Sequence, residues 1–108
     1  MTRRIEVPQD KVPAMGQRVL LDIEQRSLAL FNVEGQFYAI DDSCPHQGSS
    51  LGAGLLQGRL IQCCAHGLRF DLASGYLANS DRLRVASYPI EEEGGQIFIL
   101  IDCEVTAP

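Results

Sequence analysis

The chain has 108 residues, a length that predicts one domain, residues 1–108, large enough to bury its own core. Its formal net charge of −5 leaves it without the basic surface that nucleic-acid binding requires. No apolar run approaches the roughly 18 residues of a membrane-spanning helix, and the charged N-terminus lacks the apolar segment of a signal peptide. We therefore expect a soluble, cytoplasmic protein with no nucleic-acid or membrane partner.

The predicted elements are short strands separated by turns. Apolar and alternating runs predict strands at 18–23, 27–33, 36–40, 59–62, 83–90 and 96–101. Glu34-Gly35 is a turn signal, a second turn is expected at 91–95, and Pro89 should lie at a strand end or edge. No window has a clean helical period. The pattern predicts an all-β fold, a small antiparallel β sandwich or partial barrel.

Two stretches, 41–58 and 63–76, have the composition of loops rather than strands. They contain both histidines of the chain and three of its four cysteines. Loops carried on a rigid β scaffold are where functional sites usually lie. We therefore expect the chemistry of the protein to reside in these two loops.

The loops contain a paired cysteine and histidine pattern. Cys44 and His46 form C-x-H in the first loop, and Cys63 and His66 form C-x-x-H in the second. Thiolate and imidazole together bind zinc, copper or iron–sulfur centres. Zinc sites more often pair two cysteines with two histidines, whereas a Rieske [2Fe–2S] cluster has two cysteines on one iron and two histidines on the other. Disulfides fit a cytoplasmic chain poorly.

Residues 44–51 (CPHQGSSL) and 63–71 (CCAHGLRFD) resemble the two cluster boxes of the Rieske family. They are most similar to the stand-alone Rieske ferredoxins of bacterial ring-hydroxylating dioxygenase systems. The resemblance implies a small Rieske-like β fold with two cluster-binding loops, holding one [2Fe–2S] cluster on Cys44, His46, Cys63 and His66. It also implies an electron-transfer protein, not an enzyme, that carries single electrons from an NAD(P)H-dependent ferredoxin reductase to a terminal oxygenase through transient docking.

Three departures from the family pattern qualify the resemblance. Cys64 stands where the family usually has proline, so Cys63 is chosen as the ligand because it keeps the C-x-x-H spacing. Ser49 and Ala65 occupy the positions of the extra cysteines of high-potential Rieske proteins, so their disulfide cannot form. The segment 78–82 lacks the proline common near the cluster, which leaves the role of residues 79–81 in covering it open. Cys64 and Cys103 are interpreted as structural.

The resemblance also predicts a low reduction potential. High-potential members carry serine and tyrosine where this chain has Leu68 and Phe70, and those hydroxyls donate hydrogen bonds to cluster sulfurs. Without them, we expect a potential at the low end of the Rieske range, about −150 to +300 mV. The alternatives are a small Rieske-like subunit of an assimilatory nitrite reductase and a zinc-binding structural module.

Acidic residues suggest how the chain would meet its partners. A net charge of −5 would suit partners with basic docking faces, because complementary charge raises encounter rates. Asp41, Asp42 and the run Glu91–Glu93 are candidates for acidic docking patches. Solvated surface carboxylates are the plainer interpretation of the same residues.

Overall fold

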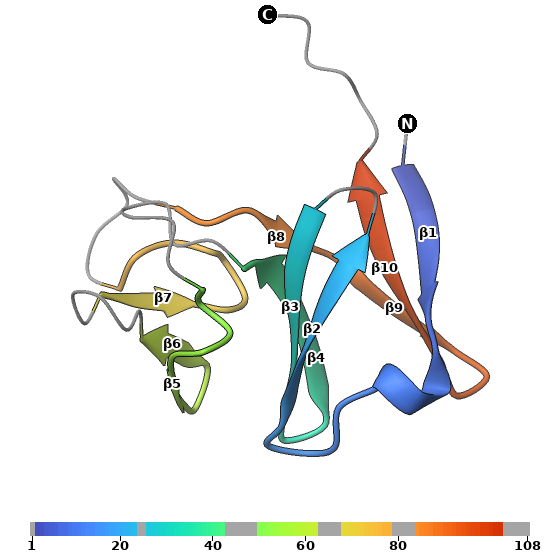
Figure 1. Ribbon diagram of the computed structural model, residues 1–108, viewed down its shortest axis with the longest axis horizontal. Coiled ribbons are helices and arrows are strands. Elements are labelled where there is room, and N and C mark those ends of the chain that lie inside the picture. The colour runs from blue at the N-terminus through green and yellow to red at the C-terminus, as the bar shows by residue number, and fades with distance from the viewer. Residues whose placement is uncertain (1, 24–25, 43–49, 63–67, 79–83, 103–108) are drawn as a thin grey trace, which may run out of the picture.

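The computed structural model describes residues 2–23, 26–42, 50–62, 68–78 and 84–102. Within these ranges the chain forms short strands and one 3-10 helix, and no described helix is long and apolar enough to cross a membrane (Figure 1). The elements are β1 (Thr2–Val7), η1 (Gln9–Lys11), β2 (Arg18–Ile23), β3 (Arg26–Val33), β4 (Gln36–Asp41), β5 (Leu55–Gln57), β6 (Leu60–Gln62), β7 (Arg69–Asp71), β8 (Ser87–Tyr88), β9 (Ile90–Glu93) and β10 (Gln96–Asp102).

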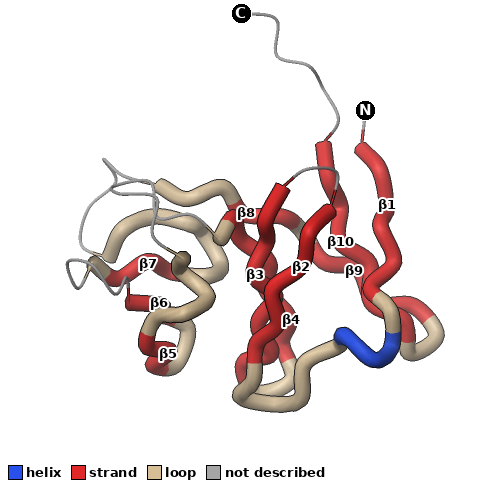
Figure 2. Tube along the Cα trace, viewed as in Figure 1, coloured by secondary structure: helices blue, strands red, loops and turns tan. Residues whose placement is uncertain are grey.

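The strands make three antiparallel sheets, which Figure 2 shows in red. Their strand orders are β1-β10-β9, β2-β3-β4-β8 and β5-β6-β7. The described strands do not close into a single barrel, and the predicted all-β antiparallel fold, a sandwich or partial barrel, is confirmed. We call the β5-β6-β7 sheet the small sheet.

The central strand β3 is buried on both of its faces. Leu28 and Leu30 pack with Ile99 and other residues of β1 and β10 in one core. Ala29 and Phe31, which point the other way, pack with buried residues of the small sheet in a second core. Burying one such side chain stabilises the fold by about 1.5–3 kcal/mol. The four-stranded sheet is therefore the layer that holds the other two in place.

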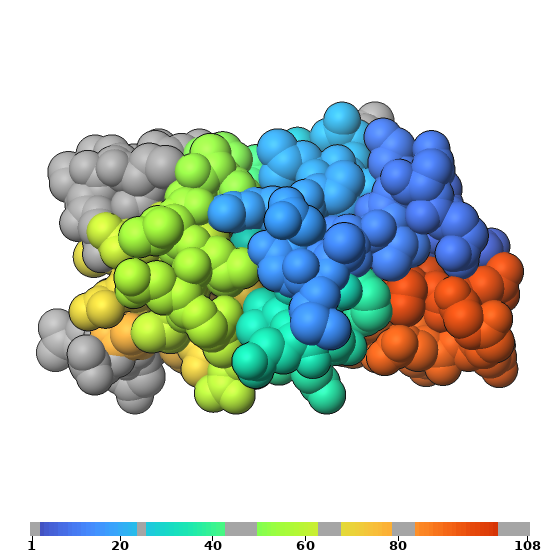
Figure 3. All heavy atoms as spheres, turned by 90° about the horizontal axis from the view of Figure 1, so that it is seen from below, coloured from blue at the N-terminus to red at the C-terminus, as the bar shows by residue number. Residues whose placement is uncertain are grey.

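The small sheet lies in a segment that leaves the four-stranded sheet and returns to the same place. β4 pairs with β8 through Ala39 and Tyr88, and the Asp41 N–H donates to the Ala86 carbonyl at 2.9 Å. Residues 42–86 thus start and finish on adjacent strands. Figure 3 shows residues 50–62 in green at one end of the molecule, away from β9 and β10 in orange and red.

Several predicted elements agree with the structure. β2, β3, β4, β6 and β10 lie at the predicted places, within one or two residues at their ends. The predicted turn at Glu34-Gly35 is confirmed, because both residues have positive φ angles, 53° and 90°. Two central residues with positive φ are characteristic of the tight hairpin turn that matches strand twist.

Other predictions about the elements were wrong. β1 was missed, because only Ile5 and Val7 of its residues are aliphatic and its order depends on pairing with β10 across the whole chain. The loop prediction for 41–58 and 63–76 overlooked β5 and β7, which are three residues each and too short for a readable alternation. Both strands form because β6 lies between them.

The C-terminal hairpin also differs from its prediction. The expected strand over 83–90 is interrupted at Pro89, which separates β8 from β9 because proline has no N–H for a ladder bond. The expected turn at 91–95 is shorter, since β9 continues to Glu93 and pairs with Gln96. Gly94 and Gly95, both with positive φ, make the turn.

Candidate functional site

The four predicted ligands lie outside the described residues. Cys44 and His46 fall in 43–49, and Cys63 and His66 fall in 63–67. The same is true of Ser49, Cys64, Ala65, Cys103 and residues 79–83. Within the described ranges no group of His, Cys, Asp or Glu could hold a metal. What the structure does show is how the ends of these segments are held.

The first cluster box is bounded by a carboxylate clasp. Asp42, the last described residue before the box, accepts hydrogen bonds from the Ser50 hydroxyl at 2.8 and 2.9 Å and from the Gly52 N–H at 2.7 Å. Its backbone carbonyl also accepts from the Leu51 N–H at 2.5 Å. Bonds to a charged acceptor are stronger than neutral ones. Asp42 therefore ties the chain before the box to the last residues of the box and to the turn that follows them.

An arginine from the four-stranded sheet holds the same turn from its other side. The Arg18 guanidinium donates to the carbonyls of Gly52 at 3.1 Å and Gly54 at 2.5 Å. It also lies 5.9 Å from the centre of the Phe31 ring. Arg18 and Asp42 together fix residues 50–54 against the layer beneath. We call this arrangement the Asp42–Arg18 clasp.

The second cluster box begins directly after β6 and ends with β7. Gln62 at the end of β6 lies opposite Arg69 at the start of β7, so residues 63–67 lie within a hairpin connection. Gln62 also lies opposite Leu55 of β5. A Cβ atom added at Gly54 would collide with the Gln62 carbonyl oxygen. Glycine at this position thus lets the residues that come after the first box approach the start of the second.

A third segment, 79–83, is bounded by the same sheet. The Ala78 N–H donates to the Arg69 carbonyl at 2.7 Å, and Tyr76 forms an isolated bridge with Arg84. The small sheet therefore holds residues at the ends of the second and third of these segments, while the clasp holds those at the ends of the first. Neighbouring strands lie about 4.8 Å apart, so the pairing of Leu55 with Gln62 brings the chain shortly after the first box beside the residue that precedes the second.

The donor set and this anchoring fit an iron–sulfur cluster. Each box contains one cysteine and one histidine, and the ends of both are held together by the small sheet and the clasp. A cluster with two thiolates and two imidazoles requires two such loops. A zinc site of the usual two-cysteine, two-histidine kind more often takes its cysteines as one closely spaced pair and its histidines as another, whereas each box here has one of each.

A family comparison agrees with this geometry. The model of the Rieske [2Fe–2S] domain matches residues 4–89. The chain belongs to the Rieske [2Fe–2S] domain family. One Rieske-type [2Fe–2S] cluster is therefore its cofactor, as the resemblance implied.

Known proteins extend the comparison to electron carriers. The ferredoxin subunit of 3-phenylpropionate/cinnamic acid dioxygenase from Escherichia coli (strain K12) is 38% identical over 103 residues, covering 92% of this chain and 93% of the relative. A chain in a complex of oxygenase and ferredoxin from carbazole 1,9a-dioxygenase is 28% identical, with a TM-score of 0.77 and coverage of 88% and 99%. These Rieske relatives are ferredoxin components, which carry electrons and are not catalysts.

A third similar structure shares the fold alone. It is described as the small subunit of an NADH-dependent nitrite reductase from Mycobacterium tuberculosis, with 20% identity and a TM-score of 0.84. The match covers 96% of the present chain and 99% of that one.

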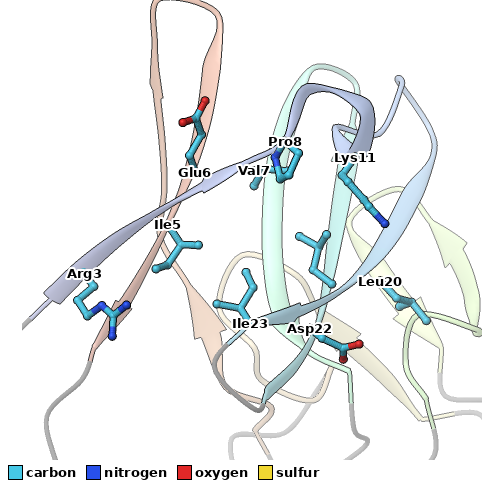
Figure 4. A pocket seen from close by; sticks show the side chains of 10 residues that line it. Arg3, Ile5, Glu6, Val7, Pro8, Lys11, Leu20, Asp22 and Ile23 are labelled. Atoms are coloured by element: carbon cyan, nitrogen blue, oxygen red, sulfur yellow. The ribbon is translucent and has the colours of Figure 1, made fainter.

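A separate hollow of the described surface lies elsewhere. This cavity has a volume of about 610 Å³ and lies between β1 and β2. Figure 4 shows Ile5, Val7 and Ile23 lining it together with charged side chains. Its carboxylates are already engaged, since Glu6 accepts from Gln96 and Asp22 from Ser27. This cavity contains no thiol or imidazole, so it is not the Rieske centre.

The sequence interpretation missed the clasp. Asp41 and Asp42 were interpreted as solvated or docking carboxylates, yet Asp42 is half-buried and bonded as described, and Asp41 accepts from the Tyr88 hydroxyl at 2.6 Å. Burial, followed by the bond to Asp41, raises the pKa of Tyr88 above its ordinary value of 10.0. An acidic residue just before a ligand box was the available signal. The sequence held no signal for the role of Arg18, because Arg18 contacts backbone atoms of residues 34 and 36 positions away.

Proposed function

We propose that this protein is a low-potential Rieske ferredoxin that carries single electrons from an NAD(P)H-dependent reductase to the terminal oxygenase of a ring-hydroxylating dioxygenase system. The observation that carries the proposal is the small sheet, which holds the ends of two boxes with one cysteine and one histidine each. The dioxygenase ferredoxin relatives support the choice of system. We further propose that residues 1–108 form one domain and act in the cytoplasm.

The ligands are proposed from the donor chemistry. Cys44 and Cys63 bind one iron, and His46 and His66 bind the other. When bound, the cluster supplies a one-electron couple with no open coordination position. Cys63 is preferred to Cys64 because the C-x-x-H spacing needs it. Cys64 and Cys103 have no role in binding.

The chain's own residues keep the boxes in position. Asp42 holds both sides of the first box through Ser50 and Gly52, and Arg18 fixes the following turn. Gly54 admits the start of the second box. A framework that does not rearrange costs no reorganisation energy when charge changes, which is the requirement of a carrier.

A second candidate is the small subunit of an assimilatory nitrite reductase. The similarity in fold to such a subunit favours it. The complete cysteine and histidine set favours the ferredoxin, since some nitrite reductase subunits of this fold lack cluster ligands. The two proposals differ in partner, so reconstitution distinguishes them. Reduced protein should support a ring-hydroxylating oxygenase and not an NADH-dependent nitrite reductase large subunit.

Metal analysis of ligand variants tests the site. Purified protein should be red-brown, with two irons and two acid-labile sulfides per chain, whereas a zinc module would be colourless. Cys63→Ser should lose the cluster, while the neighbouring Cys64→Ser should retain it and serves as the matched control. The opposite result from this pair would show that Cys64 is the ligand. A zinc-loaded protein without sulfide would refute the proposed function.

A further inference from the structure

One surface of the small sheet is at odds with the acidity of the chain. In an antiparallel sheet, directly opposed residues point to the same side. Leu56, Ile61 and Phe70 point inward and pack in the core. The residues that neighbour these three along each strand therefore point outward. The residues directly opposed to those neighbours, in β5, β6 and β7 and at the isolated bridge to Arg84, point outward as well. We define the docking face by five of these outward residues, Leu55, Gln62, Arg69, Tyr76 and Arg84.

The docking face exposes apolar and aromatic side chains. Leu55 is 56% exposed and Tyr76 is 42% exposed, and both are among the few large hydrophobic side chains that the described surface shows. The Arg84 guanidinium lies 5.5 Å from the centre of the Tyr76 ring and donates to the Ser74 carbonyl at 3.2 Å. Tyrosine and arginine are enriched in the residues that dominate binding energy at protein interfaces. A pre-positioned Tyr–Arg pair is thus suited to recognition.

The charge of this face is positive. Arg69 and Arg84 are exposed, and no carboxylate in the described ranges pairs with either. The one acidic residue on this surface, Asp71, is already paired with Arg59 at 3.1 Å. Across the segment 43–86 the sequence has four arginines and two aspartates, a formal charge of +2, so the rest of the chain has −7. Most of the negative charge lies in the other two sheets and their connections, and Asp41 and Asp42 are the acidic residues that directly precede the first box.

The position of the face relates it to electron transfer. Gln62 and Arg69 lie on either side of the second box, and Leu55 comes directly after the turn that the clasp holds. A partner seated there would lie beside the residues that bear the cluster ligands. Because charges in solution are screened over about 8 Å at physiological salt, a partner senses these arginines and not the distant glutamates.

We propose that the outer face of β5-β6-β7 is where the electron-accepting oxygenase docks, and that the oxygenase presents a carboxylate-rich surface to Arg69 and Arg84. This inference rests on the proposed function. It reverses the expectation from net charge, which favoured a basic partner. Complementary charge at the face would steer encounter and orient the partner, while Leu55 and Tyr76 supply apolar contact.

Small redox reagents of opposite charge test the electrostatic potential at the docking face. Cluster-loaded protein is reduced with dithionite, freed of excess reductant, and oxidised in a stopped-flow instrument by ferricyanide (3−) or by tris(phenanthroline)cobalt(III) (3+). In each case one electron passes from the protein to the reagent, whose metal is reduced by one unit. Ferricyanide oxidation should slow as ionic strength rises, which is the signature of attraction. A uniformly acidic protein would give that trend with the cobalt reagent instead.

Charge-reversal variants locate the effect. R69E/R84E should slow ferricyanide oxidation at low salt by about tenfold and reverse its salt dependence. The matched control R3E/K11E makes the same change in net charge on β1 and η1 and should stay close to wild type. Equal effects of both double variants, or attraction of the cobalt reagent by the wild type, would overturn the docking face. If neither reagent oxidised the protein, the proposed function itself would fail.

Discussion

Removing the carboxylate of the clasp should destabilise the site far more than removing a similar carboxylate elsewhere. In Asp42→Ala, the Ser50 hydroxyl and the Gly52 N–H lose their acceptor. A hydrogen bond to a charged group contributes about 1.5–3 kcal/mol. Asp42 is half-buried, so two such bonds discounted for solvent predict a loss of about 2–4 kcal/mol. For a domain of this size that lowers the melting temperature by about 10–20 °C.

The assay is thermal unfolding of cluster-loaded protein, followed by circular dichroism and by visible absorbance of the cluster. Asp22→Ala is the matched control, because Asp22 accepts a single bond from Ser27 at 3.1 Å on an exposed part of β2. Its melting temperature should change by only a few degrees. Asp42→Asn should recover much of the loss, since its amide oxygen still accepts from Gly52. If the two alanine variants had the same melting temperature, the clasp would have no special part in holding the first box.

Three further predictions concern packing, ionisation and redox tuning. Gly54→Ala should destabilise the protein by about 3 kcal/mol in urea unfolding, because its Cβ meets the Gln62 backbone, whereas Gly58→Ala, in open space, should cost about 1–2 kcal/mol through its φ of 58° alone. The folded protein favours the neutral form of Tyr88, so the contribution of Tyr88 to the free energy of unfolding is present below pH 10 and is lost as pH rises through the higher folded pKa. Tyr88→Phe should abolish this loss of stability at high pH. An absorbance titration in which every tyrosine ionises near pH 10 would contradict the prediction. Leu68→Ser and Phe70→Tyr should each raise the reduction potential in voltammetry at one pH if the new hydroxyl reaches a sulfur, and a wild-type potential near the top of the Rieske range would rule out the low-potential assignment.

The sequence predicted those parts of the fold that depend on local pattern. The Glu34-Gly35 turn was predictable because Gly35 adopts positive φ at no steric cost and apolar runs lie on both sides of it, whereas the positive φ of Glu34 is imposed by the hairpin. β3 was predicted as a strand from its apolar run, and burial of residues 28–32 explains why both of its faces are apolar. β1 could not be predicted, because what orders it is a partner strand about ninety residues away.

The site was predicted by a different kind of signal. The two boxes are recognisable because ligand chemistry restricts both the residue types and their spacing. The roles of the supporting residues have no such signature. Arg18 bonds to carbonyls that any residue would offer, and Gly54 is needed only because the Gln62 backbone passes close to it. Support for a site through backbone contacts becomes visible only when the fold is known.

Residues 42–86 leave the sheet at the end of β4 and return to it at the neighbouring strand β8. This segment is therefore a candidate for transplantation into another protein. Any antiparallel sheet with two neighbouring strand ends about 5 Å apart offers the same attachment points as β4 and β8. Attachment alone would not suffice, because the inner side of the small sheet packs on Ala29, Phe31 and Ile40. A recipient scaffold must therefore present a matching apolar sheet face beneath the graft, together with an arginine placed as Arg18 is.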